Sequence, residues 1–253
     1  IQHPPAFGMK IKDFNQDEIK ALPGVTDAFI IDTSLEVPGR FDEMGFQQLI
    51  AIVGDSTWQL MKAKKAIKAN WEVVSELEDS KMHLERMEKA LASGKLKQER
   101  KDGDVNAAFK KAAKVIERTY SVPFIPHNTM EPMNFFANVT EDSAELIGPT
   151  QMPNALEESV AKLLNLTLEQ VTVNMTRIGG GFGRRLYQHF GLEAAAISKK
   201  FGGPIKLIYT REDDMTQGTY RPAYLSTYKA GLDENNNLIA FSVKGTGLPE
   251  NAV

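Results

Sequence analysis

The residue types best suited to chemistry in this 253-residue chain lie at positions 179–185, which read Gly-Gly-Gly-Phe-Gly-Arg-Arg. A β-rich segment, Val171–Met175, precedes them, and a helix-like segment, Leu186–Lys200, follows them. A glycine-rich turn entering a helix directs N–H groups and the positive end of the helix dipole at one point. Such a turn suits a phosphate, or an oxo or sulfido ligand of a metal cofactor. The alternative is a tight strand-to-helix connection that binds nothing.

Common ligand-binding fingerprints do not fit the chain. A dinucleotide fingerprint read from Gly179 needs glycine at position 184, where arginine stands, and a phosphate loop needs a following Gly-Lys-Ser/Thr. The segment Asp233–Asn237 resembles the start of a calcium loop. Leu238 and Lys244 occupy the glycine and glutamate positions of that loop, so a hairpin turn is favoured.

Three other segments carry unusual polar detail: Gly148–Pro153, His127–Pro132 and Thr210–Met215. The first follows an expected strand and precedes a helix, which is where α/β proteins place ligands. The second lies between two expected strands, and the third follows a strand. Each of them alone is typical of a turn or a helix cap.

Composition excludes several functions. The net charge of −3 gives no electrostatic footprint for nucleic acid, and no apolar run is long enough to span a bilayer. The absence of cysteine excludes disulfides, thiolate zinc sites, iron–sulfur clusters and a cysteine nucleophile on this chain. The four histidines are far apart and show no metal-ligand spacing, so no metal site is predicted.

The elements that must position these residues predict an α+β fold. In residues 1–74 we expect strand, helix, strand, strand, helix, strand, with one helix begun by Asn15 and another by Ser56. Residues 75–116 form a charged linker with a partly exposed helix around Met87 and a second helix capped by Asp104 and running to Ile116.

The second domain is expected to occupy residues 117–253. Strands are expected at 119–124, 135–139, 144–147, 171–176 and 204–209, with a hairpin of 220–231 and 238–245. Helices are expected at 154–165 and 186–200, with a capping box at Thr167 and Gln170 and a helix stop at Gly202.

Taken together and in order, the four polar segments resemble the large subunit of molybdenum hydroxylases, the xanthine dehydrogenase and aldehyde oxidase family. The matching residues are 127–132, 149–152, 179–183 and 210–215. The Gly-Arg-Arg ending at Arg185 resembles the isoquinoline 1-oxidoreductase β-subunit branch. Residues 1–74 resemble the a/b-hammerhead domain of that family. The chain would then hold this domain and the first part of a molybdopterin-binding α+β domain.

The resemblance implies a molybdopterin dinucleotide, with cytosine as its nucleotide, and oxidation of aldehydes or aromatic N-heterocycles with water as oxygen donor. It places Gln151 beside the molybdenum oxo ligand. Phe182 and Gly183 would offer backbone N–H groups to the metal's ligands, and Gly180 and Gly181 would line the cofactor. The implied partners are an iron–sulfur small subunit and the remainder of the large subunit.

The sequence lacks two glutamates of the family, and each absence limits what the resemblance implies about substrate and activity. A substrate-orienting glutamate of xanthine dehydrogenases matches Leu186, which disfavours purines and favours an apolar or aldehyde substrate. The family's catalytic glutamate has no match, so the chain reads as a fragment that is inactive alone and binds cofactor weakly or not at all. A non-catalytic α+β binding or assembly module with a structural glycine turn is the alternative. The sequence does not decide between the bacterial cytoplasm and the periplasm as the location of the protein.

Overall fold

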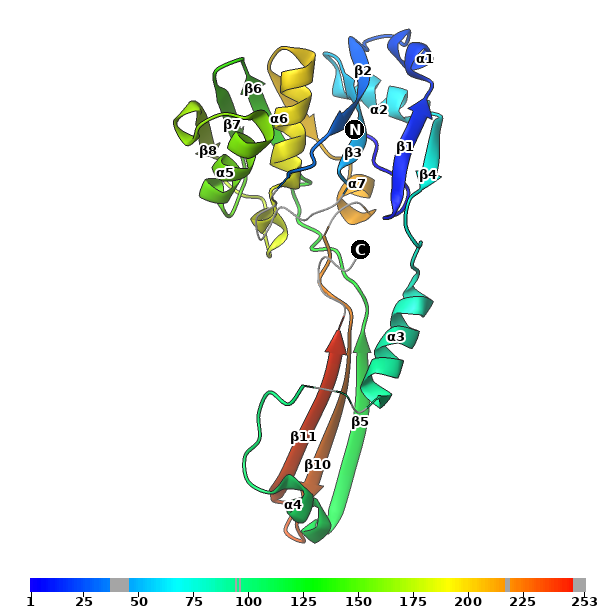
Figure 1. Ribbon diagram of the computed structural model, residues 1–253, viewed down its shortest axis with the longest axis vertical. Helices are drawn as coiled ribbons and strands as arrows, with labels where there is room; N and C mark the ends of the chain where they lie inside the picture. The colour runs from blue at the N-terminus through cyan, green and yellow to red at the C-terminus, as the bar shows by residue number, and fades with distance from the viewer. Residues whose placement is uncertain (37–45, 94, 96, 217–218, 248–253) are drawn as a thin grey trace. The chain divides into compact units, whose positions relative to one another are not determined.

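The computed structural model describes residues 1–36, 46–93, 95, 97–216 and 219–247. By backbone contacts the chain divides into two compact units (Figure 1). Of the described residues, the first unit contains 1–77 and 126–220, and the second contains 78–125 and 221–247. Helices and strands are mixed in both, so the predicted α+β class is confirmed.

The first part of unit 1 has the predicted order of strands and helices. The elements are β1 (Met9–Phe14), α1 (Gln16–Lys20), β2 (Asp27–Asp32), β3 (Gln48–Val53), α2 (Thr57–Lys65) and β4 (Ala69–Val73). The strands form two antiparallel pairs, β1 with β4 and β2 with β3. Asn15 and Ser56 precede the two helices, but neither makes the expected side-chain cap. The Asn15 amide instead donates to Glu18 and to the carbonyl of Ala66.

A four-stranded sheet forms the other part of unit 1. Its strands are β6 (Asn134–Val139), β7 (Ala144–Gly148), β8 (Val171–Met175) and β9 (Ile205–Ile208), in the order β8-β7-β6-β9. β7 and β8 are parallel, and the other pairs are antiparallel. Helix α5 (Pro153–Leu164) packs on β8, and α6 (His189–Phe201) packs on β6 and also on β2 (Figure 1).

Helix α6 brings the two parts of unit 1 into one core. Phe29 and Leu49 from the β2–β3 pair belong to the same buried cluster as Phe135, Leu146 and Phe190. The β2–β3 pair and the four-stranded sheet therefore share one hydrophobic core. The assignment of residues 1–74, 75–116 and 117–253 to separate domains stays a prediction.

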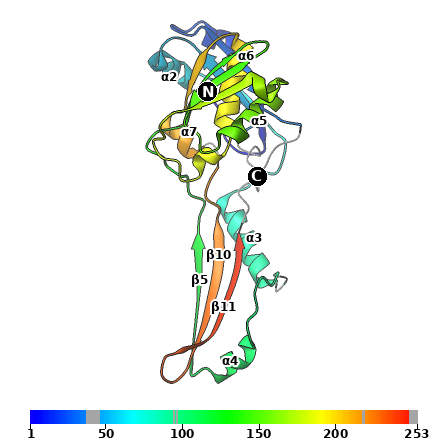
Figure 2. The same ribbon diagram turned by 90° about the vertical axis from the view of Figure 1, so that its left-hand side faces the viewer.

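Unit 2 is a three-stranded antiparallel sheet with two helices. The sheet has the order β11 (Leu238–Gly247), β10 (Tyr224–Leu232), β5 (Lys114–Val122), and α3 (Ser80–Ala92) and α4 (Val105–Lys111) pack along it (Figure 2). The side chain of Asp104 caps α4, as predicted. The helix expected to reach Ile116 ends at Lys111, because Val115 and Ile116 pair with β10 instead. In the described part of the chain, no helix is long and apolar enough to cross a membrane.

Candidate functional site

The glycine turn leaves β8 and passes through three residues with positive φ. These are Gly180 (φ 101°), Phe182 (φ 52°) and Gly183 (φ 94°). The turn closes with a 3-10 turn over Arg184–Leu186, in which the Arg184 N–H donates to the Gly181 carbonyl at 2.8 Å. Helix α6 begins only at His189, so the expected direct entry of the turn into a helix at Leu186 is wrong. The partial positive charge at the turn therefore comes from its own N–H groups and not from a helix dipole.

The side-chain amide of Gln151 is fixed by this turn. Its Oε1 accepts hydrogen bonds from the Gly183 N–H at 3.2 Å and the Arg185 N–H at 3.3 Å. The Gln151 main-chain N–H in turn donates to the Arg185 carbonyl at 2.9 Å. Two N–H donors at one amide atom require that atom to be oxygen. The amide therefore has one orientation, and its NH₂ end is left as a donor on an exposed side chain.

A Cβ on Gly181 or Gly179 would collide with a neighbouring side chain. A Cβ on Gly181 would lie 2.6 Å from Oε1 of Gln151, and a Cβ on Gly179 would lie 2.4 Å from the Cβ of Glu131. Both separations are shorter than real Cβ contacts. The absence of side chains thus lets the backbone approach Gln151 and Glu131 closely.

Arg185 is completely buried beneath the turn and bonds to three segments. Its Nε donates to the Gly180 carbonyl at 2.8 Å, and one terminal nitrogen donates to the Glu131 carbonyl at 2.8 Å and the Glu131 carboxylate at 3.0 Å. The other terminal nitrogen reaches the Pro149 carbonyl at 3.5 Å. The same Glu131 carboxylate accepts the Gly179 N–H at 2.9 Å. The segments 127–132 and 149–152 are therefore joined to the glycine turn.

The fourth polar segment reaches the same place through α7 (Arg211–Thr216). Arg211 donates to the Met130 carbonyl at 2.8 Å, to Oδ1 of Asn128 at 3.3 Å and to Asp214 at 2.9 Å. Asp214 also lies 4.0 Å from Nε of the buried Arg184. All four segments singled out from the sequence thus meet in one assembly.

A buried polar network supports the base of this assembly. Arg184 donates to Nε2 of His189 at 2.8 Å, so that nitrogen carries no proton. Burial, with a contribution from Arg184, lowers the pKa of His189 well below 6.5 and keeps the ring neutral. Tyr209 donates to Glu193 at 2.6 Å, and His3 lies 3.2 Å from the same carboxylate. No sequence motif identified Glu193 or Tyr209, and no local pattern indicated that they would meet His3 in the core.

Four of the five predicted cofactor-contacting residues lie on the turn, and the fifth, Gln151, is hydrogen-bonded to it. Gly180, Gly181 and Gly183 are half-buried, whereas Gln151 and Phe182 are exposed, Phe182 by 75%. The position of a Cβ on Gly183 is 3.5 Å from Nε2 of His127 and 4.0 Å from Leu186. His127 and Leu186 therefore flank the turn beside Gly183, and Leu186 presents an apolar side chain there.

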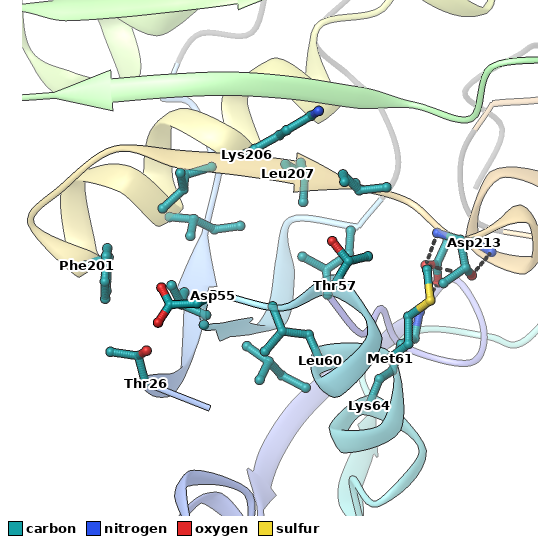
Figure 3. A pocket seen from close by; sticks show the side chains of 18 of the residues that line it. Thr26, Asp55, Thr57, Leu60, Met61, Lys64, Phe201, Lys206, Leu207 and Asp213 are labelled. Carbon is teal, nitrogen blue, oxygen red and sulfur yellow. Dashed lines mark hydrogen bonds and ion pairs between the residues drawn. The ribbon is translucent and has the colours of Figure 1, made fainter. Parts of the chain in front are cut away.

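A separate cavity of about 370 Å³ lies in unit 1 between β3, α2 and β9 (Figure 3). Leu60, Leu207 and Phe201 supply apolar walls, and Lys64 forms an ion pair with Asp213 at one end. Gln151 and the glycine turn are not among its lining residues. Among the described residues, no group of three His, Asp or Glu side chains is placed to hold a metal ion.

Comparison with known proteins identifies the family. Residues 84–247, more than half of the chain, match the molybdopterin cofactor-binding domain. The chain therefore belongs to the family of proteins that contain this domain. The matched region includes the glycine turn and the three segments that meet it.

Three individual proteins illustrate the relationship. The chain is 26% identical over 240 residues to a membrane-bound aldehyde dehydrogenase (pyrroloquinoline-quinone) of Gluconacetobacter polyoxogenes, covering 94% of this chain and 30% of that protein. It is 32% identical over 158 residues to the aldehyde oxidoreductase molybdenum-binding subunit PaoC of Escherichia coli K12, covering 60% of this chain and 22% of that protein. The aldehyde oxidoreductase structure from Desulfovibrio gigas shares the fold, with a TM-score of 0.71 over 97% of this chain and 30% of that one, at 16% identity.

These relatives are much longer than the chain, which spans about a third of one and a fifth of the other. The resemblance to molybdenum hydroxylase large subunits is confirmed at the level of the family. The comparisons leave the isoquinoline 1-oxidoreductase branch and the hammerhead assignment of residues 1–74 as predictions.

Proposed function

We propose that this chain forms one wall of a molybdopterin site in a molybdenum-containing oxidoreductase, where Gln151 and the turn Gly180–Gly183 face the cofactor. The family match and the names of the longer relatives support an oxidoreductase. The proposal concerns the complete protein, because the chain corresponds to only part of each relative.

The observation that carries the proposal is the fixed orientation of the Gln151 amide. Gly183 and Arg185 hold its oxygen, so its NH₂ group is set to donate to an acceptor outside the turn. Anionic, oxygen-rich ligands are the acceptors that such a donor recognises. The donor set therefore fits the oxo and phosphate groups of molybdopterin.

Bound molybdopterin would supply the redox chemistry and the oxygen transfer to substrate. The residues of this chain would bind and orient the cofactor through the NH₂ group of Gln151 and the backbone N–H of Phe182, because the Gly183 N–H already donates to Gln151. Because the turn carries no side chain at Gly180, Gly181 or Gly183, a large ligand can approach its backbone directly. These donors are fixed before binding and need no reorganisation when charge develops on the ligand.

The substrate is proposed to be an aldehyde or an aromatic N-heterocycle. Leu186 stands beside Gly183 where the resemblance places a glutamate in purine-oxidising relatives. An apolar side chain cannot orient a purine by hydrogen bonding, but it can pack on an apolar substrate. The exposed ring of Phe182 adds a second apolar surface at the same turn.

Further features of the complete protein are proposed from the resemblance alone. The cofactor would be the cytosine dinucleotide form, and electrons would leave through an iron–sulfur small subunit. The catalytic glutamate would come from another part of the large subunit, and residues 1–74 would be the hammerhead domain. A structural module without cofactor is the competing proposal.

Replacement of Gln151 tests the proposal. In the complete protein, Gln151→Ala should leave the molybdenum content within about twofold and lower kcat by about a hundredfold, as when an oxyanion donor is lost. The exposed Gln47→Ala is the matched control and should change neither quantity. If Gln151→Ala oxidises aldehydes at the parent rate, this amide does not face the cofactor.

A further inference from the structure

We infer that Arg185 is a positioning residue that sets the geometry of Gln151 and the glycine turn before any cofactor binds. The effect on catalysis rests on the proposed function, whereas the effect on the turn does not. We call the assembly of Arg185, Glu131 and the carbonyls of Gly180 and Pro149 the arginine clamp.

The clamp joins segments that are distant in the sequence. One guanidinium donates to the carbonyls of Glu131 and Gly180, each at 2.8 Å, and reaches that of Pro149 at 3.5 Å. Pro149 is two residues before Gln151, and Gly180 lies within the turn. The main chain of Arg185 also exchanges hydrogen bonds with Gln151, through its carbonyl and its N–H. The position of the Gln151 amide relative to the turn thus depends on Arg185, through both its side chain and its main chain.

The geometry of the clamp requires a guanidinium. Arg185 is fully buried, and its Nε and both terminal nitrogens each have an acceptor in a different direction. A lysine ammonium carries three donors on one atom and cannot reach carbonyls so far apart. Replacement by lysine would therefore keep the charge but leave buried carbonyls without partners.

Glu131 neutralises the buried charge and extends the clamp. Its carboxylate is 34% exposed, accepts from Arg185 at 3.0 Å and also accepts the Gly179 N–H at 2.9 Å. Asn134 holds the other carboxylate oxygen at 3.0 Å. Glu131 therefore connects the first glycine of the turn to the arginine below it.

The neighbouring Arg184 has a different role, although it is also buried. Its partners are His189 at 2.8 Å and Asp214 at 4.0 Å, which belong to α6 and α7. Arg184 thus secures the turn to the helices behind it, whereas Arg185 shapes the turn itself.

Hydrogen exchange of the cofactor-free protein tests the clamp directly. In Arg185→Lys, amides of residues 150–152 and 179–185 should exchange about ten- to a hundredfold faster, because charge-assisted hydrogen bonds are lost. Amides in the middle of α6 should keep the parent rate. Arg177→Lys, at an exposed position close to the turn, is the matched control and should match the parent everywhere. Exchange within twofold of the parent in both segments would overturn the inference.

Glu131→Gln provides a second, milder variant, because its site is partly exposed and the amide keeps an acceptor for Gly179. It should accelerate exchange at residues 179–185 by about threefold to tenfold, with native circular dichroism. The clamp would be refuted if Arg185→Lys fails to fold and the folded Glu131→Gln protein exchanges its amides at residues 179–185 at the parent rate. Arg185 would then contribute to overall stability only.

Steady-state kinetics of the molybdenum-loaded protein distinguish a positioning role of Arg185 from a role in stability alone. Arg185→Lys should lower kcat about ten- to a hundredfold, while KM stays within about threefold and the molybdenum content per folded chain is unchanged. Equal kcat would refute the catalytic part of the inference. If the parent itself contains no molybdenum, the proposed function fails, and hydrogen exchange still decides whether the clamp exists.

Discussion

Replacement of Gly181 by alanine should separate folding from function at the candidate site. The added Cβ would lie 2.6 Å from Oε1 and 2.8 Å from Cδ of Gln151. Gly181 does not have a positive φ, so alanine can adopt its backbone conformation. The atoms that must move are therefore at the far end of the flexible Gln151 side chain.

The magnitude follows from the hydrogen bonds that this movement breaks. Gln151 Oε1 would lose its bonds to the N–H groups of Gly183 and Arg185, which are 3.2 and 3.3 Å long. Two such bonds contribute about 1–2 kcal/mol together. The lower entropy of the unfolded alanine chain offsets about 0.4–1 kcal/mol of this. The net loss of unfolding free energy is about 1 kcal/mol, or about 2–4 °C in Tm.

The effect on turnover should be much larger, because displacing a positioned donor by about 1 Å can cost about a hundredfold. Thermal unfolding and steady-state aldehyde oxidation would be measured for Gly181→Ala and for Gly203→Ala. A Cβ on Gly203 meets only Phe201, at 3.7 Å, so that variant should behave like the parent. A Tm loss above about 10 °C, or unchanged turnover, would refute the reasoning about Gly181.

Three further variants test other parts of the account. Gly148→Ala would place a Cβ 2.6 Å from the buried ring of Phe135, so it should lower the unfolding free energy by about 1–3 kcal/mol in urea titrations; a neutral result would contradict the packing of β7 on β6. The unfolded chain protonates His189 below pH 6.5 and the folded chain does not, so stability should fall by about 1.4 kcal/mol per pH unit from 6.5 towards 5. This pH dependence should weaken in His189→Gln, and an unchanged slope would show that another titrating group causes it. Phe182→Ala should change stability by less than about 0.5 kcal/mol but raise KM for aromatic aldehydes, and equal KM values would show that the exposed ring does not contact substrate.

The sequence predicted most helices and strands, because their apolar spacing is regular and local. The capping box at Thr167 and Gln170 and the left-handed helix stop at Gly202 are both present. The helix expected to end at Ile116 was wrong, because pairing of β5 with β10, about 110 residues later, overrides the local helical preference. Likewise, the shared core between β2 and α6 depends on contacts that no local pattern encodes.

The candidate site was only partly predictable. The glycine run and Gln151 lie in segments with distinctive composition, and the structure brings them into contact. The buried guanidinium of Arg185 and its partner Glu131 are 54 positions apart, and neither has local periodicity that reveals burial. The sequence alone also predicted a helix from Leu186, whereas Arg184–Leu186 form a 3-10 turn and α6 begins at His189. Long-range hydrogen bonds, and not local secondary-structure propensity, determine the burial of Arg185 and the shape of the turn.

The most direct test of the central claim is the cofactor content of the complete protein, produced in a host that makes molybdopterin. Plasma mass spectrometry should find about one molybdenum atom per chain in the parent protein, and released pterin should be detectable by fluorescence. A folded, active protein that contains pyrroloquinoline quinone and no molybdenum would contradict the account. A folded protein with neither cofactor would show that the glycine turn is only structural.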